Sequence, residues 1–145
     1  MNFANPVGPG GGVRRGAKAQ EEDLCRRSTL LLSLESDAAR EMYDFNRNKS
    51  FVLSSDYMIL TPNVEIFRDE NNDLLDETFI VSVLTAAAPY VSQGTDGISQ
   101  DEIERVFYQR ILGVLQVAAA YGYKYLVLGA WGCGAFGNDA NVVAQ

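Results

Sequence analysis

Two adjacent carboxylates, Glu21 and Glu22, are the residues of this sequence best suited to catalysis. They follow Gln20 at the start of a segment that favours a helix, seven residues after the triplet Gly10-Gly11-Gly12. Cleavage of a glycosidic bond needs a carboxylic acid beside the departing oxygen and a carboxylate near the developing positive charge. Acidic residues at a helix start also stabilise the helix dipole, so their position alone is compatible with a purely structural role.

The glycine triplet predicts a loop that a ligand can approach closely. Glycine has no Cβ to hold the backbone away from a ligand, and successive backbone N–H groups can form an anion-binding concavity. A flexible loop is the alternative, although Pro6 and Pro9 stiffen the approach. The loop is a poor match to a nucleotide-triphosphate loop, because Gly16-Ala17-Lys18-Ala19 lacks the required Gly-Lys pair followed by Ser or Thr.

A second glycine-rich stretch lies between an expected strand and an expected helix near the end of the sequence. It reads Gly132-Cys133-Gly134-Ala135-Phe136-Gly137, which formally matches the dinucleotide fingerprint Gly-x-Gly-x-x-Gly. The match is weak, because the fingerprint expects an acidic residue about 20 positions later and the sequence ends at Gln145. A phosphate-binding loop is expected here with or without the fingerprint.

The order and spacing of these motifs resemble the microbial-type poly(ADP-ribose) glycohydrolases, which are macrodomain proteins that release ADP-ribose from its polymer. The glycine triplet, seven residues and Gln-Glu-Glu are the specific signature. Further segments support it: Asn2-Phe3-Ala4-Asn5, Gly16-Ala17-Lys18-Ala19, Cys25-Arg26-Arg27-Ser28-Thr29-Leu30, Phe67-Arg68-Asp69 and Leu128–Asn138. The resemblance extends over nearly the whole chain.

The resemblance also implies roles for individual residues. Glu22 would protonate the leaving ribose oxygen and then activate the attacking water, without a metal or other cofactor. Glu21 would hold the ribose hydroxyls, and Gln20 would support the pair. Asn5 would bond the ribose beside the scissile bond; as a single residue it could equally be a turn former. Phe136 would pack on the ribose, and its alternative role is that of a core aromatic.

The acid pair raises an electrostatic question. A helix N-terminus lowers a carboxyl pKa, whereas a general acid needs a raised one. The neighbouring carboxylate and a bound pyrophosphate act in the raising direction, since like charges disfavour ionisation. Neighbouring helical residues also point about 100° apart, so Glu21 and Glu22 are expected to have different roles.

Length and charge restrict the function further. The 145 residues predict one domain, and the net charge is −7. Residues 1–27 carry five basic and three acidic side chains, so the rest of the sequence carries −9. An acidic surface argues against direct nucleic-acid binding, while the basic first segment suits a substrate with pyrophosphates or is a solvated mixed-charge loop. An ADP-ribose polymer or an ADP-ribosylated protein is the expected partner.

The sequence contains two cysteines, Cys25 and Cys133, and no histidine. This excludes a zinc pattern and any Ser-His or Cys-His nucleophile pair within the chain. The thiols are expected to pack and to stay reduced, which predicts a cytoplasmic location. No apolar run is long enough to span a bilayer, and no secretory leader is expected.

Strands and helices are expected to alternate. Strand candidates are residues 1–4, Tyr57–Leu60, Val64–Phe67, Phe79–Thr85 and Tyr125–Ala130, the last two buried. A polar turn is expected at Asp69–Asp73. Helices are expected over Gln20–Leu34, with Leu24, Ser28, Leu31 and Leu32 on one face, over Asp37–Asn46, from the capping box Ser99–Glu102 to Gly122, and from Asp139 onward.

This alternation predicts an α/β layered fold. The family resemblance implies more: a macrodomain-like three-layer sandwich with a mixed sheet, here truncated at both ends, so that residues 1–145 form a single, partial catalytic domain. In the family the segment before Asn2 helps to hold the adenine. Two further hypotheses therefore stay open, a non-catalytic ADP-ribose-binding module and a fragment that needs further segments to fold. Repair-linked polymer turnover is the process that the resemblance implies.

Overall fold

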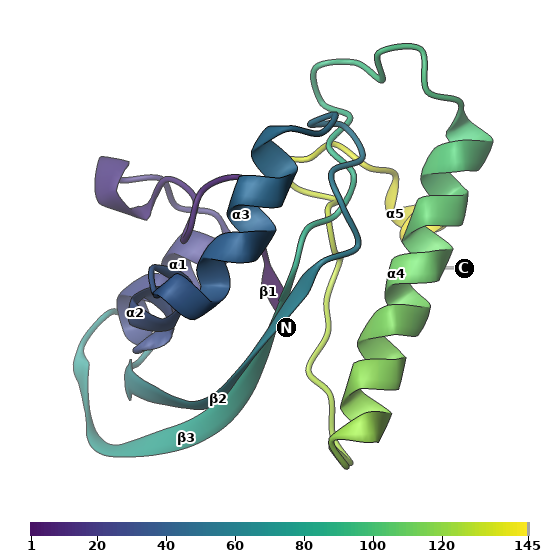
Figure 1. Ribbon diagram of the computed structural model, residues 1–145. Coiled ribbons are helices and arrows are strands. Elements are labelled where there is room, and N and C mark those ends of the chain that lie inside the picture. The colour runs from purple at the N-terminus through teal and green to yellow at the C-terminus, as the bar shows by residue number, and fades with distance from the viewer. Residues whose placement is uncertain (145) are drawn as a thin grey trace.

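A mixed three-stranded sheet forms the centre of the computed structural model, which describes residues 1–144 (Figure 1). The strands β1 (Asn2–Phe3), β2 (Met58–Arg68) and β3 (Leu74–Ala86) lie in the order β1-β3-β2. Strand β1 is parallel to β3, and β2 is antiparallel to it. Helices cover both faces, with α1, α2 and α3 on one side and α4 on the other. The expected α/β layers and mixed sheet are confirmed.

The two long strands form a hairpin, and β2 is continuous where the sequence predicted two strands separated by Thr61-Pro62-Asn63. The register with β3 shifts between Thr61 and Val64, so these residues form a bulge within one strand. A proline has no N–H for the ladder and is tolerated at such a bulge. The expected turn at 69–73 is present, since Asp69 Oδ1 accepts the N–H of Asn71 at 2.8 Å and that of Asp73 at 2.9 Å.

The helix predicted over Gln20–Leu34 is two helices, α1 (Gln20–Arg27) and α2 (Leu30–Leu34). Between them the chain bonds to β2 instead of to itself: the Thr29 N–H donates to Glu65 O, and the Glu65 N–H donates to Thr29 Oγ1, both at 3.0 Å. This break rotates the second half, so the predicted apolar face is wrong at Leu32, which is 73% exposed.

A first core lies between these helices and the sheet. Its buried members are Cys25, Leu30, Leu34, Val64 and Val83. The next elements complete this layer: η1 (Val13–Arg15) within the glycine loop, η2 (Asp37–Ala39) and α3 (Arg40–Arg47). The last two confirm the helix expected at 37–46.

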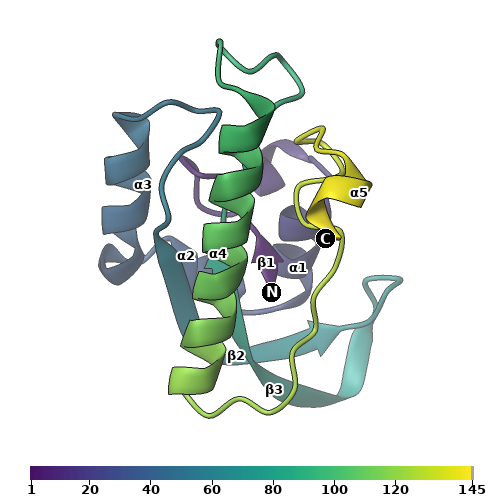
Figure 2. The same cartoon turned by 90° about the vertical axis from the view of Figure 1, so that its right-hand side faces the viewer.

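Helix α4 (Gln100–Ala120) covers the opposite face and crosses the sheet (Figure 2). Its capping box is confirmed at Ser99, whose Oγ accepts the Glu102 N–H at 3.2 Å, and Gly122 follows the helix end at φ 73°. A second core joins it to the end of β3 and the last loop; its buried members are Ala86, Ala88, Ile103, Phe107 and Trp131. Helix α5 (Ala140–Val143) is capped by Asp139.

The buried strand expected at residues 125–130 is absent, whereas the strand expected over Phe79–Thr85 is present within β3 but buried only in its second half. Residues 125–130 are extended but not part of the sheet; the Met1 amino group donates to Val127 O at 3.0 Å, and Tyr125 is 91% exposed. The first half of β3 is also open, since Phe79 and Ile80 are more than half exposed. Both segments line an apolar groove between β3 and α4, because residues 1–144 place no strand or helix there to cover them.

Candidate functional site

The acid pair lies at the first turn of α1, where β1, the glycine loop and the helix meet. Glu21 is 3% exposed and Glu22 is 8% exposed. Gln20 fixes this helix start to β1: its Oε1 accepts the Phe3 N–H at 2.8 Å, and its Nε2 donates to Met1 O at 2.9 Å. The side-chain amide of Gln20 therefore bonds to the backbone around β1 and fixes the start of α1, which carries the two carboxylates that follow.

Glu21 is held at both carboxylate oxygens. Its Oε2 accepts the Asn5 N–H at 2.7 Å, and its Oε1 accepts from Asn2 Nδ2 at 3.1 Å. Asn2 is completely buried and also donates to Thr85 Oγ1 of β3 at 3.2 Å. The sheet thus fixes the orientation of Glu21 through one amide side chain. The sequence analysis did not single out Asn2 as a site residue, although a polar residue inside a short strand could have drawn attention to it.

Glu22 has one bonded and one free oxygen. Its Oε1 accepts the Gly12 N–H at 2.8 Å. Its Oε2 is buried and has no hydrogen-bond partner among residues 1–144. A buried polar atom without a partner is uncommon and calls for an explanation. Glu22 Oε2 is therefore the one oxygen of the acid pair that lacks a partner among the described residues.

The glycine triplet packs directly on the acid pair. Gly11 has φ 57°, and a Cβ built there would collide with Glu22 Oε1 and lie 3.0 Å from Glu21 Oε2. One point above Gly11 is thus close to an oxygen of each carboxylate. The expected close approach exists, but the Gly11 N–H donates to Gly8 O at 3.0 Å and the Gly12 N–H to Glu22. The triplet therefore uses these two donors internally, not for a phosphate.

Burial raises the pKa of Glu21 from its ordinary 4.5 to about 7. The hydrogen bonds from Asn5, Asn2 and the Gly10 backbone stabilise the carboxylate and limit this rise, while the neighbouring Glu22 adds to it. Loss of hydration outweighs these donors at this position. The raised pKa therefore lies on Glu21, the member of the pair for which the sequence predicted contact with the ribose hydroxyls.

We expect this shift to make stability depend on pH. A carboxyl with a higher pKa in the folded state stabilises the fold fully below about pH 4.5, and this contribution is lost as the pH rises through about 7. The loss amounts to about 3 kcal/mol for a shift of this size. Urea unfolding of the parent and of Glu21→Gln between pH 4.5 and 8 measures it. The parent's unfolding free energy should fall relative to the variant's; a constant difference would contradict the shift.

Asn5 begins the glycine loop. Its Oδ1 accepts the N–H of Val7 at 3.0 Å and that of Gly8 at 2.9 Å, so the predicted turn role is present. The next carbonyl, Pro6 O, accepts Asn46 Nδ2 of α3 at 3.0 Å. Asn5 Nδ2 has no partner within residues 1–144 and remains available as a donor beside the acid pair. The turn and the predicted ribose contact are therefore compatible.

The second glycine-rich loop has the free donors that the first one lacks. The N–H groups of Gly134, Ala135 and Phe136 meet no acceptor in the described part of the chain. They border a cavity of about 100 Å³ that Ala19 and Gln20 border from the α1 side. Successive free amides beside a helix N-terminus can bind an anion. The structure thus brings the second loop and the start of α1 together around one cavity.

An aromatic row and a buried amide shape this loop. The ring of Phe136 packs edge-on against Tyr90 with centroids 5.1 Å apart, and Tyr90 packs on Phe51 at 5.0 Å. Asn138 is 8% exposed and donates through Nδ2 to Pro89 O at 2.7 Å and to Gly132 O at 2.9 Å. Phe136 was predicted from the sequence, whereas Tyr90 and Phe51 were not, because they come from distant loops.

The cysteines do not add chemistry to this arrangement. Both are free thiols, and Cys25 belongs to the first core. Burial raises the pKa of its thiol to about 12, so it stays protonated at neutral pH. Cys133 lies within the second loop. Residues 1–144 contain no group of three or more Cys, Asp or Glu side chains placed to hold a metal ion, and their helices include none long and apolar enough to cross a membrane.

A mixed sheet between helical layers, with paired carboxylates under one glycine loop and a second glycine-rich loop beside the start of the same helix, is a macrodomain-like arrangement. Residues 1–69 match the family described as microbial-type PARG, catalytic domain. The resemblance to the microbial-type poly(ADP-ribose) glycohydrolases that was expected from the motifs is thereby confirmed over these residues.

Solved structures extend the similarity over nearly the whole chain. The poly(ADP-ribose) glycohydrolase of Thermomonospora curvata is 45% identical, with a TM-score of 0.93; the match covers 99% of this chain and 52% of that one. The Deinococcus radiodurans enzyme, solved in complex with ADP-ribose, is 42% identical with a TM-score of 0.92, and 99% and 57% are covered. This chain therefore spans little more than half of either relative. Comparison with the curated proteins gave no match.

Proposed function

We propose that this chain carries the catalytic carboxyl groups of a poly(ADP-ribose) glycohydrolase. Such an enzyme hydrolyses the ribose–ribose O-glycosidic bond and releases ADP-ribose. The observation that carries the proposal is the free Oε2 of Glu22, buried beside a second carboxyl and beneath the glycine loop. The similarity to a glycohydrolase solved with ADP-ribose supports the choice of substrate.

Glu22 acts as general acid and then as general base in this proposal. Its protonated carboxyl gives the proton to the leaving ribose oxygen as the C–O bond breaks and positive charge develops at the anomeric carbon. The resulting carboxylate then takes a proton from a water molecule, whose oxygen bonds to that carbon. The Gly12 N–H fixes Oε1 at 2.8 Å throughout, so Oε2 is the oxygen that exchanges the proton.

Glu21 and the second loop position the substrate. Glu21 is fixed by Asn2 and Asn5 and would accept from the ribose hydroxyls, while the Asn5 amide donates to the same sugar. The free N–H groups of residues 134–136 and the α1 start would bind the diphosphate, and Phe136 would pack on the ribose. Because the pKa of Glu21 is about 7, the pair need not hold two full negative charges near a phosphate at neutral pH.

Other expectations from the sequence stay predictions: a cytoplasmic location, polymer turnover in DNA repair, action on ADP-ribosylated proteins and the absence of direct nucleic-acid binding. The binding-module alternative predicts that the chain is stabilised by ADP-ribose but forms no product. It follows from the same cavity and from the fact that the chain spans about half of its solved relatives.

Incubation with poly(ADP-ribose), followed by chromatography of the products, tests the proposal. Free ADP-ribose as the released product is the expected result. A thermal-shift titration with ADP-ribose on the same protein distinguishes the alternatives: stabilisation without release would support the binding module, and neither stabilisation nor release would remove both functions from this chain.

A further inference from the structure

Arg110 of α4 is a buried cation outside the site described above. It is only 2% exposed, although arginine is rarely buried without partners. Burial of a charge is costly unless the charge is paired and its donors are satisfied. The guanidinium of Arg110 therefore needs acceptors from the segments around it.

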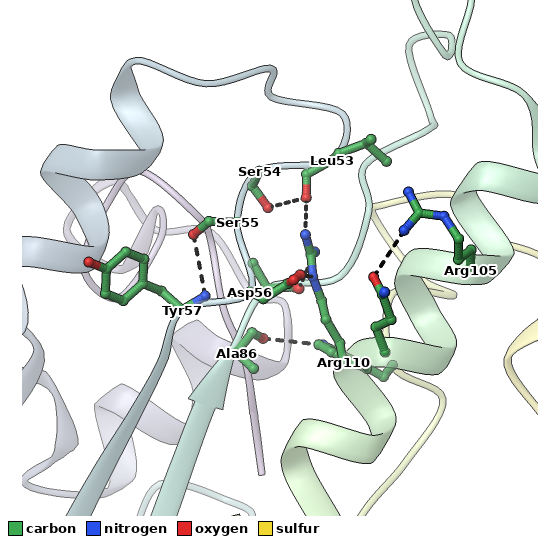
Figure 3. Close-up of polar contacts among 11 residues, drawn as sticks. Leu53, Ser54, Ser55, Asp56, Tyr57, Ala86, Arg105 and Arg110 are labelled. Carbon is green, nitrogen blue, oxygen red and sulfur yellow. Dashed lines mark hydrogen bonds and ion pairs between the residues drawn. The ribbon is translucent and has the colours of Figure 1, made fainter.

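The guanidinium connects two loops (Figure 3). Its Nε donates to Asp56 Oδ1 at 2.8 Å, its Nη1 donates to Ala87 O at 2.9 Å, and its Nη2 donates to Leu53 O. Leu53 and Asp56 precede β2, whereas Ala87 directly follows β3. The planar fork of an arginine suits such a set of acceptors, which a lysine could not satisfy together.

The same two loops hold the second glycine-rich loop. The Tyr90 N–H donates to Val52 O at 2.7 Å, one residue before the segment bound by Arg110. The Val91 N–H donates to Phe136 O at 2.8 Å, and Tyr90 packs against the Phe136 ring. A continuous series of bonds thus leads from Arg110 to Phe136, although Arg110 does not line the cavity.

We propose that Arg110 is a positioning residue for Phe136 and the free amides of residues 134–136. It sets the relative placement of the 52–56 and 87–91 segments, on which that loop rests. The effect of Arg110 on ligand binding rests on the proposed function. Its effect on the placement of the loop is a property of the protein without ligand.

Hydrogen exchange tests the coupling without any ligand. In Arg110→Lys we expect the amides of Tyr90, Val91 and Asn138 to exchange about tenfold faster, the change expected from loss of one charged hydrogen bond. The amides of α1 and the β2–β3 hairpin should keep the parent rates. No change at these sites, or an equal acceleration over the whole molecule, would overturn the proposal.

Arg105→Lys is the matched control, because Arg105 lies on the same helix, is exposed, and has its polar partners within residues 1–144 on α4 itself, at Glu102 and Gln109. It should leave the loop amides unchanged. Should Arg110→Lys fail to fold, Asp56→Asn carries the same comparison, since its side chain is 64% exposed and only one of the three bonds is weakened.

A double-mutant cycle then tests the functional side. We expect Arg110→Lys to weaken ADP-ribose binding about tenfold in the parent but less than about twofold in Phe136→Ala, because coupled residues are not additive. Equal effects in both backgrounds would show that Arg110 does not act through Phe136. If the parent itself binds no ADP-ribose, the proposed function fails, whereas the exchange rates still decide the role of Arg110.

Discussion

Replacing Glu22 by Gln is expected to slow ADP-ribose release from poly(ADP-ribose) by at least about 100-fold, the usual contribution of a general acid–base group. The Gln side chain can still accept the Gly12 N–H through its oxygen, so the 2.8 Å contact and the fold should survive. It cannot give a proton to the leaving ribose or take one from water. Initial rates at saturating polymer, with circular dichroism on both proteins, measure the effect.

Glu21→Gln is the matched comparison, because this neighbour is equally buried but bonded at both oxygens. If Glu21 holds the ribose, its substitution should raise KM more than it lowers kcat. A variant Glu22→Gln that keeps the parent rate would end the acid–base assignment. Loss of kcat in Glu21→Gln alone would transfer that role to the residue with the raised pKa.

The second large effect is expected at Gly11. Gly11→Ala places a Cβ on Glu22 Oε1 and within 3.0 Å of Glu21 Oε2, on a backbone with φ 57°. The left-handed conformation alone costs about 1–2 kcal/mol, and the collision must move the carboxylate or the loop. A displacement near 1 Å at a reacting group can cost about 100-fold in rate, so we expect a loss of at least that size in kcat/KM.

Gly16→Ala separates the collision from the backbone strain. Gly16 has φ 81°, but no atom lies within 4 Å of a Cβ at this position. This control should lower the unfolding free energy by a similar strain of about 1 kcal/mol while activity stays near the parent value. Equal activities for the two variants would show that the contact of Gly11 with the acid pair does not matter for function.

Some of the site follows directly from the sequence because it depends on local patterns. The capping box at Ser99 and the turn at Asp69 satisfy backbone groups within a few residues, and the spacing between the glycine triplet and Gln-Glu-Glu is contained in one loop. These features need no knowledge of the rest of the fold. The structure therefore has the two glycine loops and the helix start with its acid pair at the positions predicted from the sequence, while the roles of these residues stay predictions.

The errors have a common physical cause, which is tertiary contact. Thr29 leaves the helix because β2 offers better partners for its backbone and hydroxyl, and Pro62 is accommodated in a strand by a bulge. Asn2 and Arg110 form hydrogen bonds with residues that lie 19 to 83 positions away in the sequence, so local patterns do not predict their roles. An apolar run such as 125–130 predicts a buried strand only if neighbours cover it, which the sequence does not specify.

The structure also changes the roles expected for the two glycine loops. Both were expected to bind phosphate. The backbone of the first loop instead packs against two carboxylates, and its Gly12 N–H donates to Glu22. The second loop has consecutive unbonded amides and lines the cavity beside α1. The proposed function therefore assigns catalysis and anion binding to separate loops, both of which lie beside the start of α1.

A structure of this protein with ADP-ribose is the most direct test of the central claim. We expect the ribose that carries the reacting carbon to lie within hydrogen-bond distance of Glu22 Oε2 and the diphosphate to contact the N–H groups of Gly134, Ala135 and Phe136. A ligand that occupies the second loop but leaves Glu22 Oε2 without a contact, or one that binds elsewhere on the molecule, would contradict it.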